Sequence, residues 1–308
     1  MISYIVRRTL SAIPTLFIVI TVSFFIMRLA PGGPFDRERN LPPEIEANML
    51  RAYNLDKPLA LQYVHYVERL LVFDFGPSYM VRDFTVRDLI LDGLPASMQL
   101  GGTAIALALV FGVLFGALAA LRQNSATDYT VMGVAMTGIA IPNFVMAPIL
   151  TLVFGVYLSW LPVAGWGGGA WINKVLPIVT LALPQVAYIA RLSRGSMIEV
   201  LHSNYIRTAH AKGLGGRIVL FRHALKGALL PVVSYLGPAT AAIMTGSVVV
   251  ETIFEVPGIG RYFVQGALNR DYPLVMGVVV FYAALIIVLN LLVDVIYSFL
   301  DPKLRAKK

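Results

Sequence analysis

Six long apolar runs, separated by polar stretches, set the pattern of this chain. They cover residues 10–29, 98–121, 129–158, 175–190, 232–253 and 274–300. An α-helix needs about 20 apolar residues to cross a bilayer, so each run is a candidate span. Pro142 and Pro148 interrupt the long third run, and Pro177 and Pro184 interrupt the short fourth one. The pattern predicts six transmembrane helices, the third of them kinked or broken.

The first run follows Arg7 and Arg8, as the core of a cleaved signal peptide would. Its apolar stretch, however, exceeds the roughly 7 to 15 residues of a signal-peptide core. The sequence after it, from Arg28 to Pro31, is also a poor cleavage site because it offers no pair of small residues at the required spacing. We therefore expect a retained first span.

Residues 31–95 are polar and hold ten acidic and seven basic side chains, so they face water. Pro42 and Pro43 are placed to open a helix. Apolar residues recur here at helical spacing: Ile45, Met49, Tyr53, then Leu59, Tyr63, Val67 and Leu71. The stretch predicts a small helical insertion between spans 1 and 2, whose apolar stripes pack on the rest of the protein or on a partner.

Small residues and tryptophans mark two further places. Gly112 and Gly116 have the spacing that permits close helix contact in a membrane. Trp160, Trp166 and Trp171 fall in one glycine-rich loop between the third and fourth runs. Tryptophan is enriched at membrane surfaces, so this loop is expected to lie at one.

The composition agrees with a membrane protein. Hydrophobic residues make up 57% and charged residues 14%, with a mean hydropathy of +0.74, which leaves too few charges to cover a soluble globule of 308 residues. The net charge of +8 is spread over the ends of apolar runs without interleaved aromatic residues, so we expect no nucleic-acid binding. The chain has no cysteine, which excludes disulfides and cysteine metal sites.

Lysine and arginine are unevenly divided among the loops. The N-terminus, the turn after the second run, residues 191–230 and the C-terminal tail hold 14 of them. The tail contributes Lys303, Arg305, Lys307 and Lys308. The loops on the other side hold only Lys174, Arg261 and Arg270. By the positive-inside rule both termini and residues 191–230 are cytoplasmic, and the insertion at 31–95 is extracytoplasmic.

Residues 191–230 carry seven lysines and arginines against the single acid Glu199. A lysine or arginine at the centre of a bilayer costs roughly 3 kcal/mol even on a lenient scale, so this segment is a loop. It also holds His202, His210 and His223. Because no paired carboxylates accompany them, we expect no metal site.

A short helix is predicted inside this loop. Ser203 and Asn204 are good N-cap residues, residues 205–212 suit a helix, and Gly213 is placed as a left-handed stop. Isolated helices of this length are marginal in water, so the helix is expected to need a partner.

A second helix is predicted after the Gly215-Gly216 pair. Its apolar face is expected to hold Ile218, Phe221, Leu225 and Leu229, with Arg222 and Lys226 on another face. The two helices fit either a basic surface that lies on anionic lipid or a docking site for a soluble cytoplasmic protein.

The chain shows no catalytic motif. It has no P-loop, no Gly-x-Ser-x-Gly elbow and no His-Glu-x-x-His, so it is not expected to be an enzyme or to hold a cofactor. Asp294 is the one acid well inside a span, and close to the cytoplasmic end it is expected to pair with a base or reach water. A stand-alone secondary transporter would need more charges within its spans. An intramembrane hydrolase would need a nucleophile.

The loop helix carries a resemblance. Residues 205–213, Tyr-Ile-Arg-Thr-Ala-His-Ala-Lys-Gly, resemble the EAA coupling loop of ABC importer membrane subunits in its peptide-permease form. The general pattern is Glu-Ala-Ala, three residues, Gly, nine residues, Ile-x-Leu-Pro. Here Arg207, Thr208 and Ala209 take the first three places and Gly213 is kept. The last four places fall on residues 223–226, and the proline is displaced to Pro231.

Other short motifs look like those of the B-type membrane subunit of oligopeptide importers. They are Arg7-Arg8 with Ile13-Pro14-Thr15, Leu29-Ala30-Pro31-Gly32, Asp74-Phe75-Gly76-Pro77-Ser78, Ala190-Arg191-Leu192-Ser193-Arg194-Gly195-Ser196-Met197, Arg222-His223-Ala224-Leu225, Glu251-Thr252-Ile253-Phe254, Pro257-Gly258-Ile259-Gly260 and Asn269-Arg270-Asp271-Tyr272. Together they cover essentially the whole chain.

The resemblance implies an all-α polytopic protein with the type I ABC importer permease fold, in the bacterial plasma (inner) membrane. It implies a second homologous permease, two cytoplasmic ATPases that hold the ATP and Mg²⁺, and an extracytoplasmic peptide-binding protein as partners. The implied function is import of oligopeptides, with dipeptides, nickel chelates or other small solutes left open.

The resemblance also assigns roles to residues. The helix that contacts the ATPase comprises Asn204, Tyr205, Ile206, Arg207, Thr208, Ala209, His210, Lys212 and Gly213. Support for this helix is implied for Arg217, Arg222, His223, Lys226 and Pro231.

Overall fold

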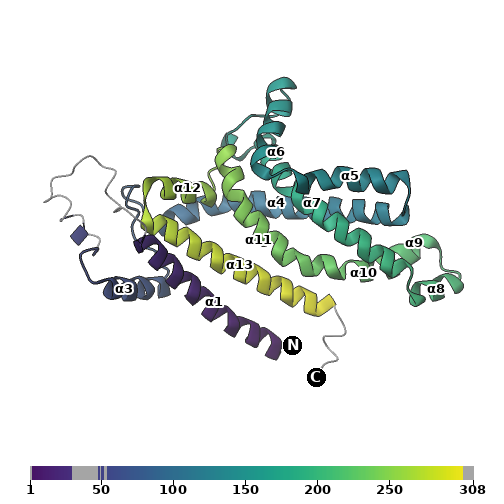
Figure 1. Ribbon diagram of the computed structural model, residues 1–308, viewed down its shortest axis with the longest axis horizontal. Coiled ribbons are helices and arrows are strands. Elements are labelled where there is room, and N and C mark those ends of the chain that lie inside the picture. Colours follow the sequence, from purple (N-terminus) through teal and green to yellow (C-terminus); the bar gives the residue numbers. More distant parts are fainter. Residues whose placement is uncertain (1, 30–47, 49, 52–53, 301–308) are drawn as a thin grey trace.

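The computed structural model describes residues 2–29, 48, 50–51 and 54–300, and within these the chain is almost entirely helical (Figure 1). The elements are α1 (Ile2–Leu29), α3 (Leu59–Leu71), α4 (Val86–Leu121), α5 (Ala126–Ala140), α6 (Asn143–Leu150), η1 (Thr151–Tyr157), η2 (Gly167–Gly169), α7 (Trp171–Leu201), α8 (Asn204–Ala211), α9 (Gly216–Ile218), η3 (Val219–Ala224), α10 (Leu225–Ala228), α11 (Leu230–Ile253), α12 (Ile259–Asn269) and α13 (Tyr272–Leu300). The expected all-α fold is confirmed.

Five described helices are long and apolar enough to cross a membrane. They are residues Arg8–Leu29, Val86–Leu121, Trp171–Leu201, Leu230–Ile253 and Tyr272–Tyr297. A sixth span is present if α5 is counted together with α6 and η1, which follow it after a bend of 108°. The length and composition of the helices therefore allow the six predicted spans.

The bend after α5 has a local cause in the sequence. A residue before proline is pushed out of the α region, and Ile141 is extended, with φ −105° and ψ 115°. Pro142, which has no N–H to donate, then starts α6. In Figure 1 the segment α6 points away from α5 and α7. The prediction that the third run is broken is confirmed.

Helix α4 begins at Val86, well before the expected span at residue 98, so the end of the expected insertion belongs to this helix. Its start is a capping box, in which the Asp88 N–H donates to Thr85 Oγ1 at 3.2 Å and the Thr85 N–H donates to Asp88 Oδ2 at 3.0 Å. Helix α7 likewise extends beyond the expected range of 175–190 at both ends.

The insertion is described only in part. The first apolar stripe and its two prolines lie outside the described residues, as do Lys303, Arg305, Lys307 and Lys308 of the tail. In α3, Tyr63 packs on Phe24 of α1, whereas Leu59 and Leu71 are exposed. The predicted stripe of α3 is thus only partly a packing face. Tyr66, which is not in that stripe, also packs on α1 because its ring stacks on Phe24.

Helices α4, α5 and α7 form a close-packed unit in which glycines replace side chains at the contacts. A Cβ atom on Gly112 would lie 2.6 Å from Ile189 Cγ2, and one on Gly116 would lie 2.5 Å from the Ala190 carbonyl oxygen. A Cβ on Gly138 of α5 would lie 2.4 Å from the Leu183 carbonyl oxygen. The close contact predicted from Gly112 and Gly116 is confirmed.

Helix α1 lies at the edge of the bundle beside α13 (Figure 1). Arg8, near the start of α1, lies with its Nε 2.8 Å from Asp294 Oδ2 near the end of α13. The expected pairing of Asp294 with a base is confirmed. It joins the N-terminal end of α1 to the C-terminal end of α13.

A second acid inside a span was missed by the sequence analysis. Glu251 of α11 is 0% exposed and accepts hydrogen bonds from Ser97 Oγ of α4 at 2.8 Å and from the Gly260 N–H of α12 at 2.7 Å. The Ile259 N–H donates to Ser97 Oγ at 2.9 Å. These bonds fix the start of α12 against α4 and α11, which satisfies helix N–H groups that have no partner within the helix.

The glycine contacts predict the effect of adding one methyl group to α4. Gly116→Ala should lower the free energy of unfolding by about 1–3 kcal/mol, because the new Cβ overlaps the backbone of α7. Gly102→Ala is the matched control in the same helix, since a Cβ there meets nothing within 4 Å. The measurement is the apparent melting temperature of the purified protein in detergent. Equal melting temperatures for the two variants would contradict the close contact.

Candidate functional site

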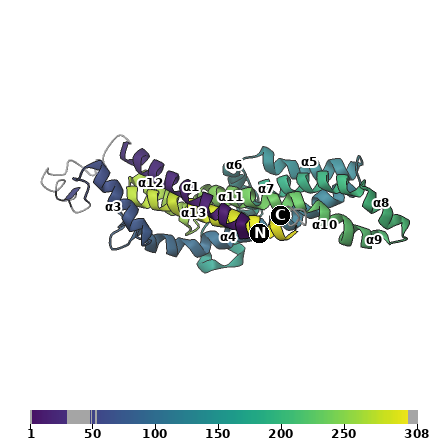
Figure 2. The same cartoon turned by 90° about the horizontal axis from the view of Figure 1, so that it is seen from below.

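The candidate site is the basic helix α8 with the segments that support it. Helices α8 and α9 lie at one end of the long axis of the molecule, and α3 lies at the other (Figures 1 and 2). Helix α8 follows directly on the end of α7, and α9, η3 and α10 lead from it into α11.

The inner face of α8 is held by the protein itself. Ile206 is 2% exposed and Ala209 is also buried, and both belong to one apolar cluster. The other buried members of this cluster are Ala120, Met197, Val219, Ala224 and Ala228. Segments η3 and α10, together with the ends of α4 and α7, therefore hold the inner face of α8, for which the sequence predicted a partner.

The two ends of α8 are formed differently. At its start Ser203 has the backbone conformation of an N-cap, but its hydroxyl donates to the Val200 carbonyl oxygen at 2.6 Å and caps no helix N–H. At its end Gly213 has φ +77°, as expected for a left-handed stop. The Gly213 N–H donates to the His210 oxygen at 2.9 Å and the Leu214 N–H to the Ala209 oxygen at 3.3 Å, which is a Schellman motif.

The outer face of α8 is polar and basic. Its exposed residues are Asn204, Tyr205, Arg207, Thr208, His210 and Ala211, followed by Lys212 and Gly213. Acidic side chains are absent from residues 204–213, so the face offers hydrogen-bond donors and positive charge. Such a face is complementary to a surface that carries hydrogen-bond acceptors and negative charge.

The supporting residues follow in the next segment. Arg217, Arg222 and Lys226 are exposed, His223 is partly buried, and Pro231 is exposed in the first turn of α11. None of them is brought into the buried cluster beneath α8.

The apolar face predicted for this segment is wrong at two of its four residues, because Leu225 and Leu229 are partly buried against the core whereas Ile218 and Phe221 are not. Phe221 is 67% exposed and Ile218 is exposed as well, whereas Val219, Ala224 and Ala228 are the buried residues. The cause is the π-helical turn at Val219–Ala224, whose wider hydrogen-bond spacing shifts the residues that face the core away from the ordinary helical period.

An ion pair near α8 was not predicted. Arg194 of α7 donates from Nε to Asp128 Oδ1 at 2.7 Å and from Nη2 to Asp128 Oδ2 at 2.6 Å. Asp128 is 1% exposed and lies in the first turn of α5, after the N-cap Ser125. The Ser-x-x-Asp spacing is an N-cap signal that could have located the start of α5, but the partner on α7 has no signal in the sequence.

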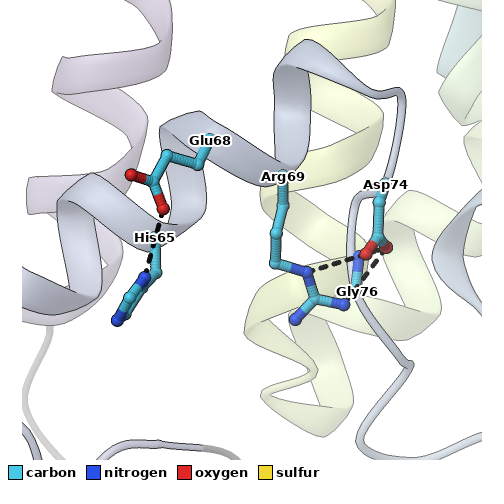
Figure 3. Close-up of polar contacts among 5 residues, drawn as sticks. All are labelled: His65, Glu68, Arg69, Asp74 and Gly76. Atoms are coloured by element: carbon cyan, nitrogen blue, oxygen red, sulfur yellow. Dashed lines mark hydrogen bonds and ion pairs between the residues drawn. The ribbon is translucent and has the colours of Figure 1, made fainter.

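At the opposite end, the described part of the insertion presents its own polar contacts (Figure 3). His65 and Glu68 lie 3.3 Å apart on α3, and Arg69 Nε donates to Asp74 Oδ2 at 2.8 Å. Asp74 also accepts from the Gly76 N–H, which orders the turn after α3. The hydrogen bond from Arg69 is the main reason why the pKa of Asp74 lies below its ordinary value.

The residues that follow this turn are hydrogen-bonded to the start of α13. Asp271 is buried and accepts hydrogen bonds from the Ser78 hydroxyl and from the Tyr79 N–H, the latter at 3.1 Å. A cavity of about 350 Å³ lies beside this turn, with Arg28, Tyr66 and Arg69 among its lining residues. The insertion is thus fixed to the ends of α1 and α13.

Long apolar helices that end in an exposed basic helix, held by a core of its own, define a multi-pass membrane protein. Comparison with protein families places it further. The model of the binding-protein-dependent transport system inner membrane component matches residues 112–306, and the N-terminal model of the same kind of component matches residues 1–101. The chain belongs to this family of bacterial inner-membrane transport permeases, which are not enzymes.

Curated relatives match the chain from end to end. The oligopeptide transport system permease protein OppB of Salmonella typhimurium is 57% identical over 305 residues, which cover 99% of this chain and 100% of that protein. The dipeptide transport system permease protein DppB of Bacillus subtilis is 43% identical, over 99% of this chain and 98% of that protein.

A solved structure supports the fold alone. The MetNI methionine ABC transporter, in an inward-facing conformation, aligns with a TM-score of 0.56 and 16% identity, over 69% of this chain and 96% of that chain. The type I permease fold expected from the resemblance agrees with this likeness.

The buried inner face of α8 predicts which substitutions loosen it. Ile206→Ala should lower the free energy that holds α8 in its packed position by about 2–5 kcal/mol, because it leaves a cavity between α8, α7 and η3. Thr208→Ala on the exposed face should have a small effect, since that hydroxyl only donates to the Asn204 oxygen of the same helix. Amide hydrogen exchange of residues 204–212 measures the difference. Faster exchange in both variants, or in neither, would mean that Ile206 does not anchor the helix.

Proposed function

We propose that this chain is one of two membrane-spanning subunits of an ATP-driven, binding-protein-dependent importer of oligopeptides. The observation that carries the proposal is the 57% identity to an oligopeptide permease over the whole length of both proteins. The exposed basic face of α8 gives such a subunit a surface for a cytoplasmic ATPase.

In this function α8 transmits movement and performs no chemistry. When two partner ATPases bind ATP and close, they displace the outer face of α8. Because Ile206 and Ala209 are packed among residues of α4, α7 and η3, the displacement passes to those helices. A path between this chain and a second, homologous permease then opens to one side of the membrane and closes to the other.

The remaining partners follow from the two ends of the molecule. The ATP and Mg²⁺ belong to the ATPases, and this chain supplies no cofactor. A peptide-binding protein docks at the end formed by α3 and α12, outside the cell membrane. Both termini lie on the cytoplasmic side with α8, in keeping with the excess of lysine and arginine there.

Dipeptides are the second candidate substrate. The support for them is the 43% identity to a dipeptide permease, again over nearly the whole chain. Both candidates use the same coupling surface and differ only in the length of the peptide.

Co-purification and transport test the proposal. From membranes of the native organism, the tagged chain should bring down a second permease and ATPase subunits. The complex is reconstituted in vesicles and supplied with the binding protein. It should then take up peptides of four or five residues only when ATP is present on the side of the membrane that carries the ATPases. Uptake restricted to dipeptides would favour the second candidate. Purification of the chain without ATPase subunits, together with ATP-independent uptake, would overturn the function.

The conformation of Gly213 predicts a variant that separates ATP hydrolysis from uptake. Gly213→Val should leave membrane insertion intact but lower the peptide taken up per ATP hydrolysed, because valine is strained at φ +77° and the end of α8 must shift. Gly215→Val is the matched control, since residue 215 has φ −63° and equally open surroundings. A normal ratio of uptake to hydrolysis in the first variant would count against transmission through α8.

A further inference from the structure

The ion pair between Asp128 and Arg194 is built more tightly than a surface contact. Both carboxylate oxygens of Asp128 accept from the guanidinium, at 2.7 and 2.6 Å, and Oδ2 also accepts from the Asn124 N–H at 3.0 Å. Arginine is suited to this two-bond geometry, which fixes orientation as well as distance. The pair therefore holds the start of α5 at one angle to α7.

Burial makes this pair hard to separate. Asp128 is almost completely buried, and the Arg194 side chain is 29% exposed. Separating the two side chains would leave a buried carboxylate without its compensating charge, which is costly. Arg191, one turn earlier on α7, makes a different contact. Its guanidinium carbon lies 5.3 Å from the centroid of the Tyr188 ring, over which it stacks.

The pair lies where three helices and the α8 cluster meet. A Cβ on Gly116 of α4 would lie 2.9 Å from the Arg194 backbone nitrogen, so α4 contacts α7 at this residue. Met197, less than one turn further along α7, is part of the buried cluster that holds Ile206 of α8. The pair is thus the polar contact that joins α5 to the part of α7 next to α8.

Helix α5 also contacts α7 far from the pair. At Gly138 it meets the Leu183 backbone, and it then ends in the 108° bend that leads to α6 and η1. Segment α6 contacts α11 and α7. A rotation of α7 that is transferred to the start of α5 would therefore change the position of the bent segment.

We propose that the Asp128–Arg194 ion pair is a positioning link that makes α5, and with it the bent α6–η1 segment, follow the movement of α8. This inference rests on the proposed function, because it assumes that α8 is displaced by an ATPase. The link acts through the orientation of two helices and touches neither ATP nor the transported peptide.

The experiment compares variants in the assembled complex reconstituted in vesicles, with wild type as reference. Asp128→Asn and Arg194→Gln should lower the peptide taken up per ATP hydrolysed by about tenfold, a usual size for the coupling between two sites. Arg194→Lys keeps the charge but loses the two-bond fork, so its ratio should fall by less. The amount of assembled complex and its ATPase rate are measured for every variant.

Two control variants separate positioning from stability. Arg191→Gln removes a neighbouring arginine of α7 that stacks on Tyr188, and Ser125→Ala removes the N-cap of α5 but leaves the ion pair. Both should keep the wild-type ratio of uptake to hydrolysis. An equal fall of the ratio in the controls would overturn the inference.

The remaining outcomes are also decisive. If the ion-pair variants assemble less complex but the complex that remains has the wild-type ratio, the pair is structural only and the inference is overturned. The inference is overturned as well if no ion-pair variant assembles at all, because coupling would then be inseparable from folding. If wild type itself shows no ATP-dependent uptake, the proposed function is wrong, and the inference that rests on it is overturned with it.

Discussion

Direct backbone contact between α4 and α7 is the constraint on which the rest of the structure depends. Gly112 and Gly116 leave no room for a side chain between the two helices, so α4 and α7 behave as one body. Their ends contribute residues to the cluster that buries Ile206. The same contact also fixes the position of Arg194 along α7, opposite Asp128. Without the close contact between α4 and α7, neither α8 nor α5 would have a fixed position.

Charge inside the apolar helices obeys a second constraint, because an unpaired charge in hydrocarbon is costly. Asp294 is paired with Arg8, Asp128 with Arg194, and Glu251 accepts hydrogen bonds from Ser97 and the start of α12. The Arg8–Asp294, Asp128–Arg194 and Ser97–Glu251 contacts each join elements that are distant in the sequence. These polar contacts therefore add fixed points to an arrangement that the close packing of α4 against α7 already sets.

The sequence predicted the features that depend on local chemistry. The spans follow from apolar length, the break at Pro142 from the geometry of proline, and the end of α8 at Gly213 from its positive φ. The sequence did not predict where the helix departs from its ordinary period, or which distant residue pairs with a buried charge. The π-helical turn moved the buried face from Ile218 and Phe221 to Val219 and Ala224.

The partner of a buried charge is the hardest feature to predict, since Asp128 and Arg194 are separated by 66 positions. The same separation makes the pair informative about function. A contact within one helix would stabilise that helix alone, whereas this one joins the start of the broken span to the helix that carries α8. Since close packing already joins α4 to α7, this two-bond contact adds α5 to the same group of helices.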